Sequence, residues 1–163
     1  MYVPIGCGKC MECRRQKAQS WRVRLCEELK AQQYSYFITL TYNDESLQKL
    51  CENFNTTDAN TIAAKSVRLF LERWRKKYGK SLRHWLITEL GQEHDRLHLH
   101  GIFFTGKPLN NETLQSIWQY GYSDTGEYCN IRTINYIIKY VTKLDTTHKQ
   151  YTPLIMCSPG LGK

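Results

Sequence analysis

The sequence predicts an α+β fold in which helices pack on an antiparallel sheet. Apolar residues recur at helical spacing in several segments, which indicates amphipathic helices. Two alternating segments, 83–90 and 96–104, are separated only by the polar stretch 91–95. A short polar connection of this kind joins neighbouring antiparallel strands in a hairpin. Hairpin-linked strands with interspersed helices favour a ferredoxin-like or RNA-recognition-like topology.

The first half of the chain is expected to hold a helix, a strand and a second helix. Residues 14–32 have apolar side chains at helical spacing, namely Ala18, Trp21, Leu25 and Leu29. Residues 34–42 are rich in aromatic and β-branched side chains, which is typical of a strand. Residues 43–60 are polar, so we expect a loop with a short helical piece. The segment 63–78 is an amphipathic helix that Gly79 is placed to end, with an apolar stripe at Val67, Phe70, Leu71, Trp74 and Tyr78.

The second half is expected to continue from the hairpin with two more helices and one more strand. A short helix is predicted at 110–119, a strand at 128–132 and a last helix at 133–144. All of these elements fit a single domain over 1–163, with the segment 1–32 as part of it. The chain enters a motif almost at once and ends on the loop-like stretch 158–163, so we expect a domain trimmed from a longer protein.

Composition points to a polyanionic partner. The chain has 163 residues, of which 41% are apolar and 23% charged, as is ordinary for a soluble globular domain. Lys and Arg number 23 against 15 Asp and Glu, which gives a net charge of +8. This balance favours nucleic acid over an anionic membrane surface. No apolar run approaches the roughly 20 residues that span a bilayer, and no signal peptide opens the chain, so no membrane partner is expected.

Two histidines at 98 and 100 form a candidate metal site. They alternate with apolar residues in the predicted strand, so both imidazoles point to the same face. Neutral imidazoles are good ligands for divalent metals, and an oxygen ligand is preferred if the metal is Mg²⁺ or Mn²⁺. Glu89 is the best third ligand because hairpin pairing can bring it beside His98 or His100. The turn residues Glu93, His94 and Asp95 are rivals, and His84 has the opposite parity to Glu89.

A tandem Tyr-x-x-Lys run follows about forty residues later. Tyr136 and Tyr140 are four residues apart, as are Lys139 and Lys143, so each pair shares one surface of a helix. A tyrosine can attack phosphorus if a metal or a lysine assists it, because its ordinary pKa is about 10. The Thr142–Lys143 side slightly favours Tyr140 as the first nucleophile. The alternative is that one or both rings pack in the core, since Ile and Val residues surround them.

Three cysteines near the start form a C-x₂-C-x₂-C motif. Cys7, Cys10 and Cys13 could supply three thiolates to a structural Zn²⁺, with Cys26 or Cys157 as the fourth ligand. Iron–sulfur ligation has weaker support because a fourth cysteine at a recognised offset is missing. The alternative is that they are three reduced thiols, since seven cysteines without a secretion signal argue against a disulfide framework.

Basic and aromatic side chains are candidates for DNA contacts. Phosphate contacts are expected from Arg14, Arg15, Lys17, Arg22 and Arg24, and from the later helix with Arg75, Lys76 and Lys77. Candidate platforms for stacking unpaired bases are Trp85, Trp118, Tyr120 and Tyr122. Aromatic residues are more often part of a core, and charged helix faces are usually only solvated.

Four segments together resemble a known group of proteins. They are Phe37–Tyr42, Leu97–Gly101, Tyr136–Lys143 and the opening Gly6–Arg14. The first three look like the three motifs of the HUH endonuclease superfamily, in particular the replication initiators of microviruses. The opening segment looks like the N-terminal region of the gokushovirus-like members. The resemblance covers almost the whole chain and keeps the motifs in order.

The resemblance implies a sheet-centred HUH fold and a Mg²⁺- or Mn²⁺-dependent nick in single-stranded DNA at a replication origin. It further implies a 5′-phosphotyrosine intermediate and a free 3′-OH that primes rolling-circle synthesis. By position, His98, His100 and Glu89 match the metal ligands, and Tyr136 and Tyr140 match the nucleophiles. The setting is the host bacterial cytoplasm. The sequence has no P-loop, so a host helicase is expected alongside the polymerase.

Two alternatives remain open from the residues. The first is a non-catalytic nucleic-acid-binding module on an RNA-recognition-like sheet, although a recognisable RNP signature is missing from the two candidate strands. The second is a relaxase or a single-strand transposase, which shares the chemistry and differs in biological context.

Overall fold

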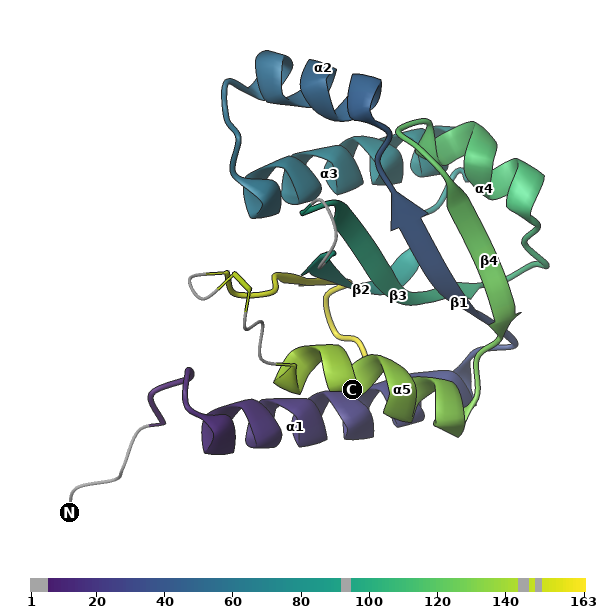
Figure 1. Cartoon of the computed structure of the whole chain (residues 1–163). Coiled ribbons are helices and arrows are strands. Elements are labelled where there is room, and N and C mark those ends of the chain that lie inside the picture. Colours follow the sequence, from purple (N-terminus) through teal and green to yellow (C-terminus); the bar gives the residue numbers. More distant parts are fainter. Residues whose placement is uncertain (1–5, 92–94, 144–146, 149–150) are drawn as a thin grey trace.

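The computed structural model describes residues 6–91, 95–143, 147–148 and 151–163. Helices and strands alternate around one sheet (Figure 1). In chain order the elements are α1 (Met11–Ala31), β1 (Tyr34–Thr41), α2 (Asp44–Phe54), α3 (Ala59–Tyr78), β2 (Arg83–Leu90), β3 (Leu97–Thr105), α4 (Asn111–Trp118), β4 (Ser123–Tyr128), α5 (Ile131–Thr142) and β5 (Ile155–Cys157).

The sheet has the strand order β4-β1-β3-β2-β5, and each pairing between these strands is antiparallel. From β1 to β4 the chain follows the β-α-β-β-α-β plan of ferredoxin-like folds, with α2 and α3 in the first crossover and α4 in the second. The predicted α+β class, the ferredoxin-like topology and the hairpin of β2 and β3 are therefore confirmed.

Three expectations about individual elements need correction. Residues 43–60 contain the full helix α2 rather than a short helical piece in a loop, because Leu47, Leu50 and Phe54 recur at helical spacing and pack on the core. The fourth strand lies at Ser123–Tyr128 and not at 128–132, because Asn130 begins α5 with a capping box. Strand β5 was not predicted.

The alternation of side chains along each strand divides the core into two layers. One face of the sheet carries Ile38, Leu99 and Phe103 and is covered by α2, α3 and α4 (Figure 1). The other face carries Ile87 and Ile102 and is covered by α1 and α5. Both faces are buried, so each apolar strand residue of the core belongs to one of two separate clusters.

Gly101 allows the central strands to approach closely. A Cβ atom added at this position would lie 2.2 Å from the carbonyl oxygen of Trp85 and 2.5 Å from a methyl group of Leu86. Any side chain at 101 would therefore force β3 away from β2. The glycine that directly follows the two histidines is thus a packing requirement of the sheet.

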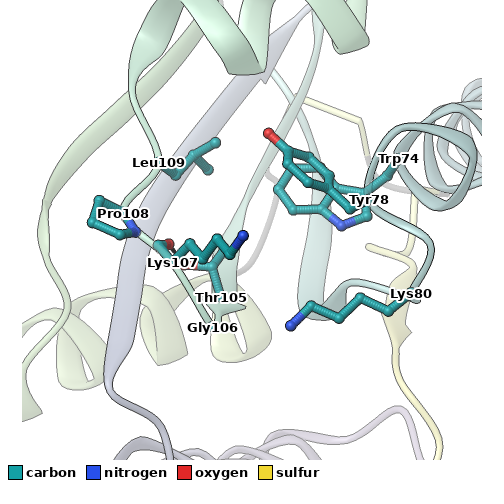
Figure 2. Close-up of a pocket in the computed structure, with 8 residues that line it drawn as sticks. All are labelled: Trp74, Tyr78, Lys80, Thr105, Gly106, Lys107, Pro108 and Leu109. Atoms are coloured by element: carbon teal, nitrogen blue, oxygen red, sulfur yellow. Dashed lines mark hydrogen bonds between the residues drawn. The ribbon is translucent and has the colours of Figure 1, made fainter.

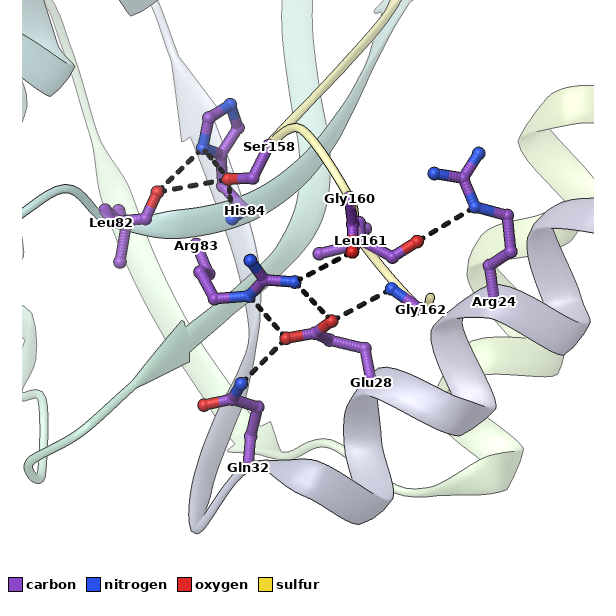
Figure 3. A network of polar contacts seen from close by, with 10 residues as sticks. All are labelled: Arg24, Glu28, Gln32, Leu82, Arg83, His84, Ser158, Gly160, Leu161 and Gly162. Atoms are coloured by element: carbon purple, nitrogen blue, oxygen red, sulfur yellow. Dashed lines mark hydrogen bonds and ion pairs between the residues drawn. The ribbon is translucent and has the colours of Figure 1, made fainter.

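A buried ion pair ties the C-terminal segment to α1 and β2 (Figure 3). The Glu28 side chain, in α1, accepts two hydrogen bonds from Arg83, with Nε to Oε1 at 2.5 Å and Nη2 to Oε2 at 2.6 Å. The backbone N–H of Gly162 and the side chain of Gln32 donate to the same carboxylate. Glu28 is only 4% exposed, and these donors offset the cost of burying its charge.

We expect Glu28→Gln to lower the free energy of unfolding by about 2 kcal/mol. The substitution leaves the Arg83 guanidinium facing a neutral amide, and the loss stays moderate because Arg83 is partly exposed. Urea unfolding followed by circular dichroism measures the change. Glu27→Gln is the matched control because Glu27 pairs with Lys30 on the exposed side of α1, and we expect it to cost less than about 0.5 kcal/mol. Equal losses in the two variants would contradict this account.

Candidate functional site

The two histidines lie on β3, the strand that β1 and β2 flank. His98 is opposite Glu89 on β2, as the hairpin predicts. The rings of His98 and His100 are nearly parallel, with centroids 6.4 Å apart. Leu99 between them is fully buried on the other face of the sheet. The predicted common face of the two imidazoles is therefore confirmed.

Glu89 lies at the centre of the polar contacts of the site. Its Oε2 is 3.0 Å from Nε2 of His100, and its Oε1 accepts a hydrogen bond from the Lys143 ammonium group. Burial raises the pKa of Glu89, but the contacts with His100 and Lys143 outweigh burial and hold the pKa below its ordinary value. Glu89 is thus an anion at neutral pH although its side chain is only 17% exposed.

His98 is held in the form that binds metals. Burial, together with the neighbouring His100, lowers the pKa of His98 below its ordinary value. The imidazole is therefore neutral at pH 7 and keeps a nitrogen lone pair. A neutral imidazole beside a carboxylate is chemically suited to a divalent cation.

Helix α5 presents its tyrosines to the histidine strand. Its apolar residues Ile134 and Ile137 are fully buried against the sheet. The ring of Tyr140 stacks on His100, with centroids 4.7 Å apart and planes at 20°. The hydroxyl oxygen of Tyr140 lies 3.3 Å from that of Tyr136. The helix thus assigns its apolar side to the core and its tyrosine pair to the site.

The two tyrosines differ in their surroundings. Tyr136 is 49% exposed and packs edge-on against Phe37. Burial, the hydrogen bond with Tyr136 and the charge of Glu89 together raise the pKa of Tyr140. Each predicted lysine lies over a tyrosine ring, because Lys139 Nζ is 5.5 Å from the centroid of Tyr136 and Lys143 Nζ is 5.8 Å from that of Tyr140.

Sequence reasoning missed two residues of β1 that complete this surface. Thr39 Oγ1 lies 3.4 Å from Nδ1 of His100, and the Phe37 ring is stacked near the same histidine, with centroids 6.2 Å apart. Both have the odd parity of the strand 34–41. That alternation was visible in the sequence, but the pairing of β1 with β3 was not.

The rival ligands do not lie in this group. Asp95 is exposed and its Oδ1 is 2.6 Å from Nε2 of His148. His84 is buried on the opposite face, where its Nδ1 is 3.1 Å from the hydroxyl oxygen of Ser158, so its predicted parity is confirmed. Glu93 and His94 lie outside the described residues.

The three N-terminal cysteines do come together. The sulfur atoms of Cys7, Cys10 and Cys13 all lie within 4.8 Å of one another, and across 6–91, 95–143, 147–148 and 151–163 no other three His, Cys, Asp or Glu ligand atoms do so. Cys26 and Cys157, the expected fourth ligands, pack instead against the core between α1, α5 and the sheet.

The candidate basic residues form two groups on opposite faces of the sheet. Arg14 and Lys17 on α1 line a cavity of about 40 Å³ with Ile87 and Val141, near the end of α5. Arg22 donates to Asn135 of α5, Arg24 donates to the Leu161 carbonyl, and Arg15 is exposed. The other group is at the end of α3, on the face away from the histidines, and consists of Arg75, Lys76 and Lys77.

Most of the aromatic candidates are core residues. Trp85 and Trp118 are fully buried, and Tyr120 packs on Tyr42 and Trp118. The two tryptophans are therefore closed to a nucleic-acid base, and the stacking hypothesis is wrong for both of them. Tyr122 is 64% exposed and stays a candidate.

A second cavity lies at the far end of β3. Figure 2 shows Trp74, Tyr78 and Lys80 on one side of it and the segment 105–109 on the other. Its volume is about 70 Å³. Thr105, one of the lining residues, is seven positions along the strand from His98, or about 23 Å away. This cavity is separate from the site of the histidines and tyrosines.

A β-α-β-β-α-β sheet whose histidine pair faces a two-tyrosine helix defines a domain of the HUH-like class. The family model for the replication-associated protein ORF2 matches residues 35–145. This match covers more than half of the 163 residues, so the chain belongs to that family. The matched range contains the histidine strand and the tyrosine helix.

Two phage proteins are similar to the chain. The replication-associated protein ORF4 of Chlamydia phage 1 is 25% identical over 86% of this chain and 38% of its own length. The replication-associated protein ORF2 of Spiroplasma virus 4 is 26% identical over 85% of this chain and 48% of its own length. The chain thus spans less than half the length of these relatives. No solved structure is significantly similar to it.

No helix in the described part of the chain is long and apolar enough to cross a membrane. This agrees with the hydropathy of the sequence.

We expect Lys143→Met to raise the pKa of Glu89, because it removes a cation that stabilises the carboxylate. A carboxylate whose pKa is lowered by folding stabilises the fold above its unfolded pKa of about 4.3, and this contribution is lost as the pH falls through the folded pKa. The variant should therefore lose less stability than the wild type on acidification. Carboxyl ¹³C shifts of Glu89 followed against pH measure the change.

Lys139→Met is the matched control because the Lys139 ammonium lies over the ring of Tyr136, whereas that of Lys143 donates to Glu89. The same rise in both lysine variants would show that general charge, rather than the contact with Lys143, sets the pKa of Glu89.

Proposed function

We propose that this domain nicks single-stranded DNA and transfers the strand through a phosphotyrosine, as part of a rolling-circle replication initiator. The observation that carries the proposal is the stacking of Tyr140 on His100, with the Tyr136 hydroxyl 3.3 Å from that of Tyr140. Two nucleophile candidates therefore lie directly over the candidate metal face. Membership of a replication-associated family supports a role in replication.

His98, His100 and Glu89 are the residues that would hold a divalent cation. Their chemistry fits Mg²⁺ or Mn²⁺, because the set contains two imidazoles, one of them with a lowered pKa, and a carboxylate that is ionised at neutral pH. A bound cation would supply polarisation of the scissile phosphate and would stabilise its developing charge. Glu89 now contacts Lys143, so ligation requires the carboxylate to exchange this ammonium for the cation.

The covalent step conserves one phosphoester bond. The oxygen of Tyr136 or Tyr140 attacks phosphorus and forms a P–O bond, while the bond from phosphorus to the 3′ oxygen breaks. The tyrosine proton is lost to solvent, and the departing 3′ oxygen takes up a proton to become the free 3′-OH. Strand transfer is the reverse reaction with a new 3′-OH, so neither an oxidant nor a nucleotide cofactor is needed.

The lysines and the basic residues of α1 supply positive charge around this step. Lys139 and Lys143 lie beside the tyrosine rings and can pair with phosphate oxygens as the strand enters. Arg14 and Lys17 extend the same positive surface along α1. The group at the end of α3 lies on the opposite face of the sheet, so it is better placed for DNA flanking the site than for the scissile phosphate.

The partners follow from the products of the reaction. A free 3′-OH is a primer for a host polymerase, and unwinding of the duplex falls to a host helicase or to a part of the full-length protein outside this sequence. The reaction takes place in the host bacterial cytoplasm. These are proposals for the whole protein, of which the chain covers a part.

We expect a protein–DNA adduct that survives denaturant when the domain, Mn²⁺ and single-stranded phage genome are mixed. Tyr136→Phe and Tyr140→Phe should each keep part of the adduct because the two hydroxyls are close enough to reach one phosphate. The double variant should lose it by a factor on the order of 10³ or more. Denaturing gels with labelled DNA measure the yield.

Tyr122→Phe is the matched control because Tyr122 is an exposed tyrosine outside α5. If the double variant still forms the adduct, the tyrosine assignment is wrong. If DNA binds tightly and wild-type protein forms no adduct on origin-containing DNA, the domain is a non-catalytic nucleic-acid-binding module.

We expect Mn²⁺ to raise the melting temperature of the domain, because a ligand that binds only the folded state stabilises it. His98→Ala combined with His100→Ala should abolish the rise, as should Glu89→Gln in large part. Glu127→Gln, which changes an exposed carboxylate of β4, should leave the rise intact. Differential scanning fluorimetry at several Mn²⁺ concentrations measures these shifts. An unchanged shift in the double histidine variant would rule out this ligand set.

A further inference from the structure

We propose that Cys7, Cys10 and Cys13 bind a zinc ion that fixes the N-terminal loop against the C-terminal end of α5. This site lies outside the histidine and tyrosine group, and its role is structural. It uses the cysteine motif for which the proposed nicking reaction has no need.

The spacing of the sulfur atoms matches zinc coordination. Zn–S bonds of about 2.3 Å in tetrahedral geometry place neighbouring sulfurs roughly 3.8 Å apart. The sulfur atoms of Cys7 and Cys13 lie 3.9 Å apart, and all three lie within 4.8 Å of one another. Small side-chain rotations are therefore enough to close three Zn–S bonds.

The backbone of the loop is shaped around these sulfurs. The N–H of Cys10 donates to the sulfur of Cys7 at 3.2 Å, which favours a thiolate at that position. Gly8 has a φ of +72°, a left-handed conformation that disfavours any other residue. At Gly6, a Cβ atom would lie 2.9 Å from the Cys13 sulfur, so the missing side chain leaves room for that sulfur.

The charges near the loop suit an anionic centre. Three thiolates and Zn²⁺ carry a net charge of −1, and the site lies at the N-terminal end of α1, where the helix dipole favours negative charge. Hydrogen bonds from the backbone of Cys10 and Lys9 lower the pKa of Cys7 to about 7. Each thiol releases its proton to solvent as its Zn–S bond forms, and no electrons are transferred.

Zinc fits better than an iron–sulfur cluster. A cluster needs four protein ligands in the usual case, and Cys26 is thirteen residues beyond Cys13 on the same helix, or about 20 Å along its axis. Cys157 packs in the core on β5. Three exposed or partly exposed thiolates leave the fourth position of a tetrahedral zinc ion to water or to another small ligand.

Arg14 connects the cysteine loop to the tyrosine helix. This residue follows Cys13 directly, and its Nε donates to the carbonyl of Lys9 at 3.0 Å. Its Nη1 donates to the carbonyl of Lys143 at 3.3 Å, just beyond the end of α5. A zinc ion that holds Cys13 and the loop together therefore also holds the guanidinium that caps this helix end.

The test is the zinc content of the full chain, purified from cells supplied with zinc and measured by elemental mass spectrometry. We expect about one zinc per chain, and less than about a tenth of that in Cys7→Ser, Cys10→Ser and Cys13→Ser. Cys51→Ser is the matched control because Cys51 is a partly buried cysteine on α2, and it should keep the metal. His98→Ala with His100→Ala should keep it too, which separates this site from the one proposed for Mg²⁺ or Mn²⁺.

Two further measurements decide the identity and the role of the metal. Cobalt added to metal-free protein should give a cobalt–thiolate charge-transfer band that the cysteine variants lack. Zinc removal should speed amide hydrogen exchange at 7–14 and at 139–143 several-fold, with α3 unchanged. Absence of bound zinc, zinc retained in all three serine variants, or iron with sulfide in anaerobically purified protein would overturn the site. Unchanged exchange at 139–143 would overturn the coupling to α5.

Discussion

The two-residue period of β3 is the constraint on which the rest of the structure depends. This strand is hydrogen-bonded on both sides, and its odd positions Leu99 and Phe103 fill the core under α3 and α4. Its even positions, which include His98 and His100, face α5. A slip of one residue in either pairing would exchange the two sets, and Gly101 fixes the register by admitting the backbone of β2 at close range.

Glu89 is the point at which the sheet and the tyrosine helix are joined electrostatically. Its carboxylate contacts an imidazole from β3 and an ammonium group from the end of α5, and both contacts keep it ionised. The same carboxylate is the one oxygen ligand that we assign to the divalent cation. The position of α5 and the occupancy of the cation site are therefore linked through one side chain, because Lys143 and a metal compete for it.

Features that depend on short-range pattern were predictable, and features that depend on long-range pairing were not. The shared face of His98 and His100 and the hairpin with Glu89 follow from alternation alone, and the amphipathic helix around Tyr136 follows from its spacing. Strand β4 has no apolar alternation and exists because β1 offers it hydrogen bonds, so its position was predicted wrongly. The burial of Trp85 and Trp118 and the contact of Thr39 with His100 likewise needed the tertiary structure.

The alternation of β3 has a consequence for how such a domain can change over time. Adjacent positions answer to different demands, one to packing and the next to chemistry, so a single substitution alters one property and leaves the other nearly intact. Variants that are inert yet well folded are then one or two substitutions away. A lineage can also retune the ligands on the α5 side while the apolar residues beneath them keep the sheet together, which makes the metal preference more evolvable than the fold.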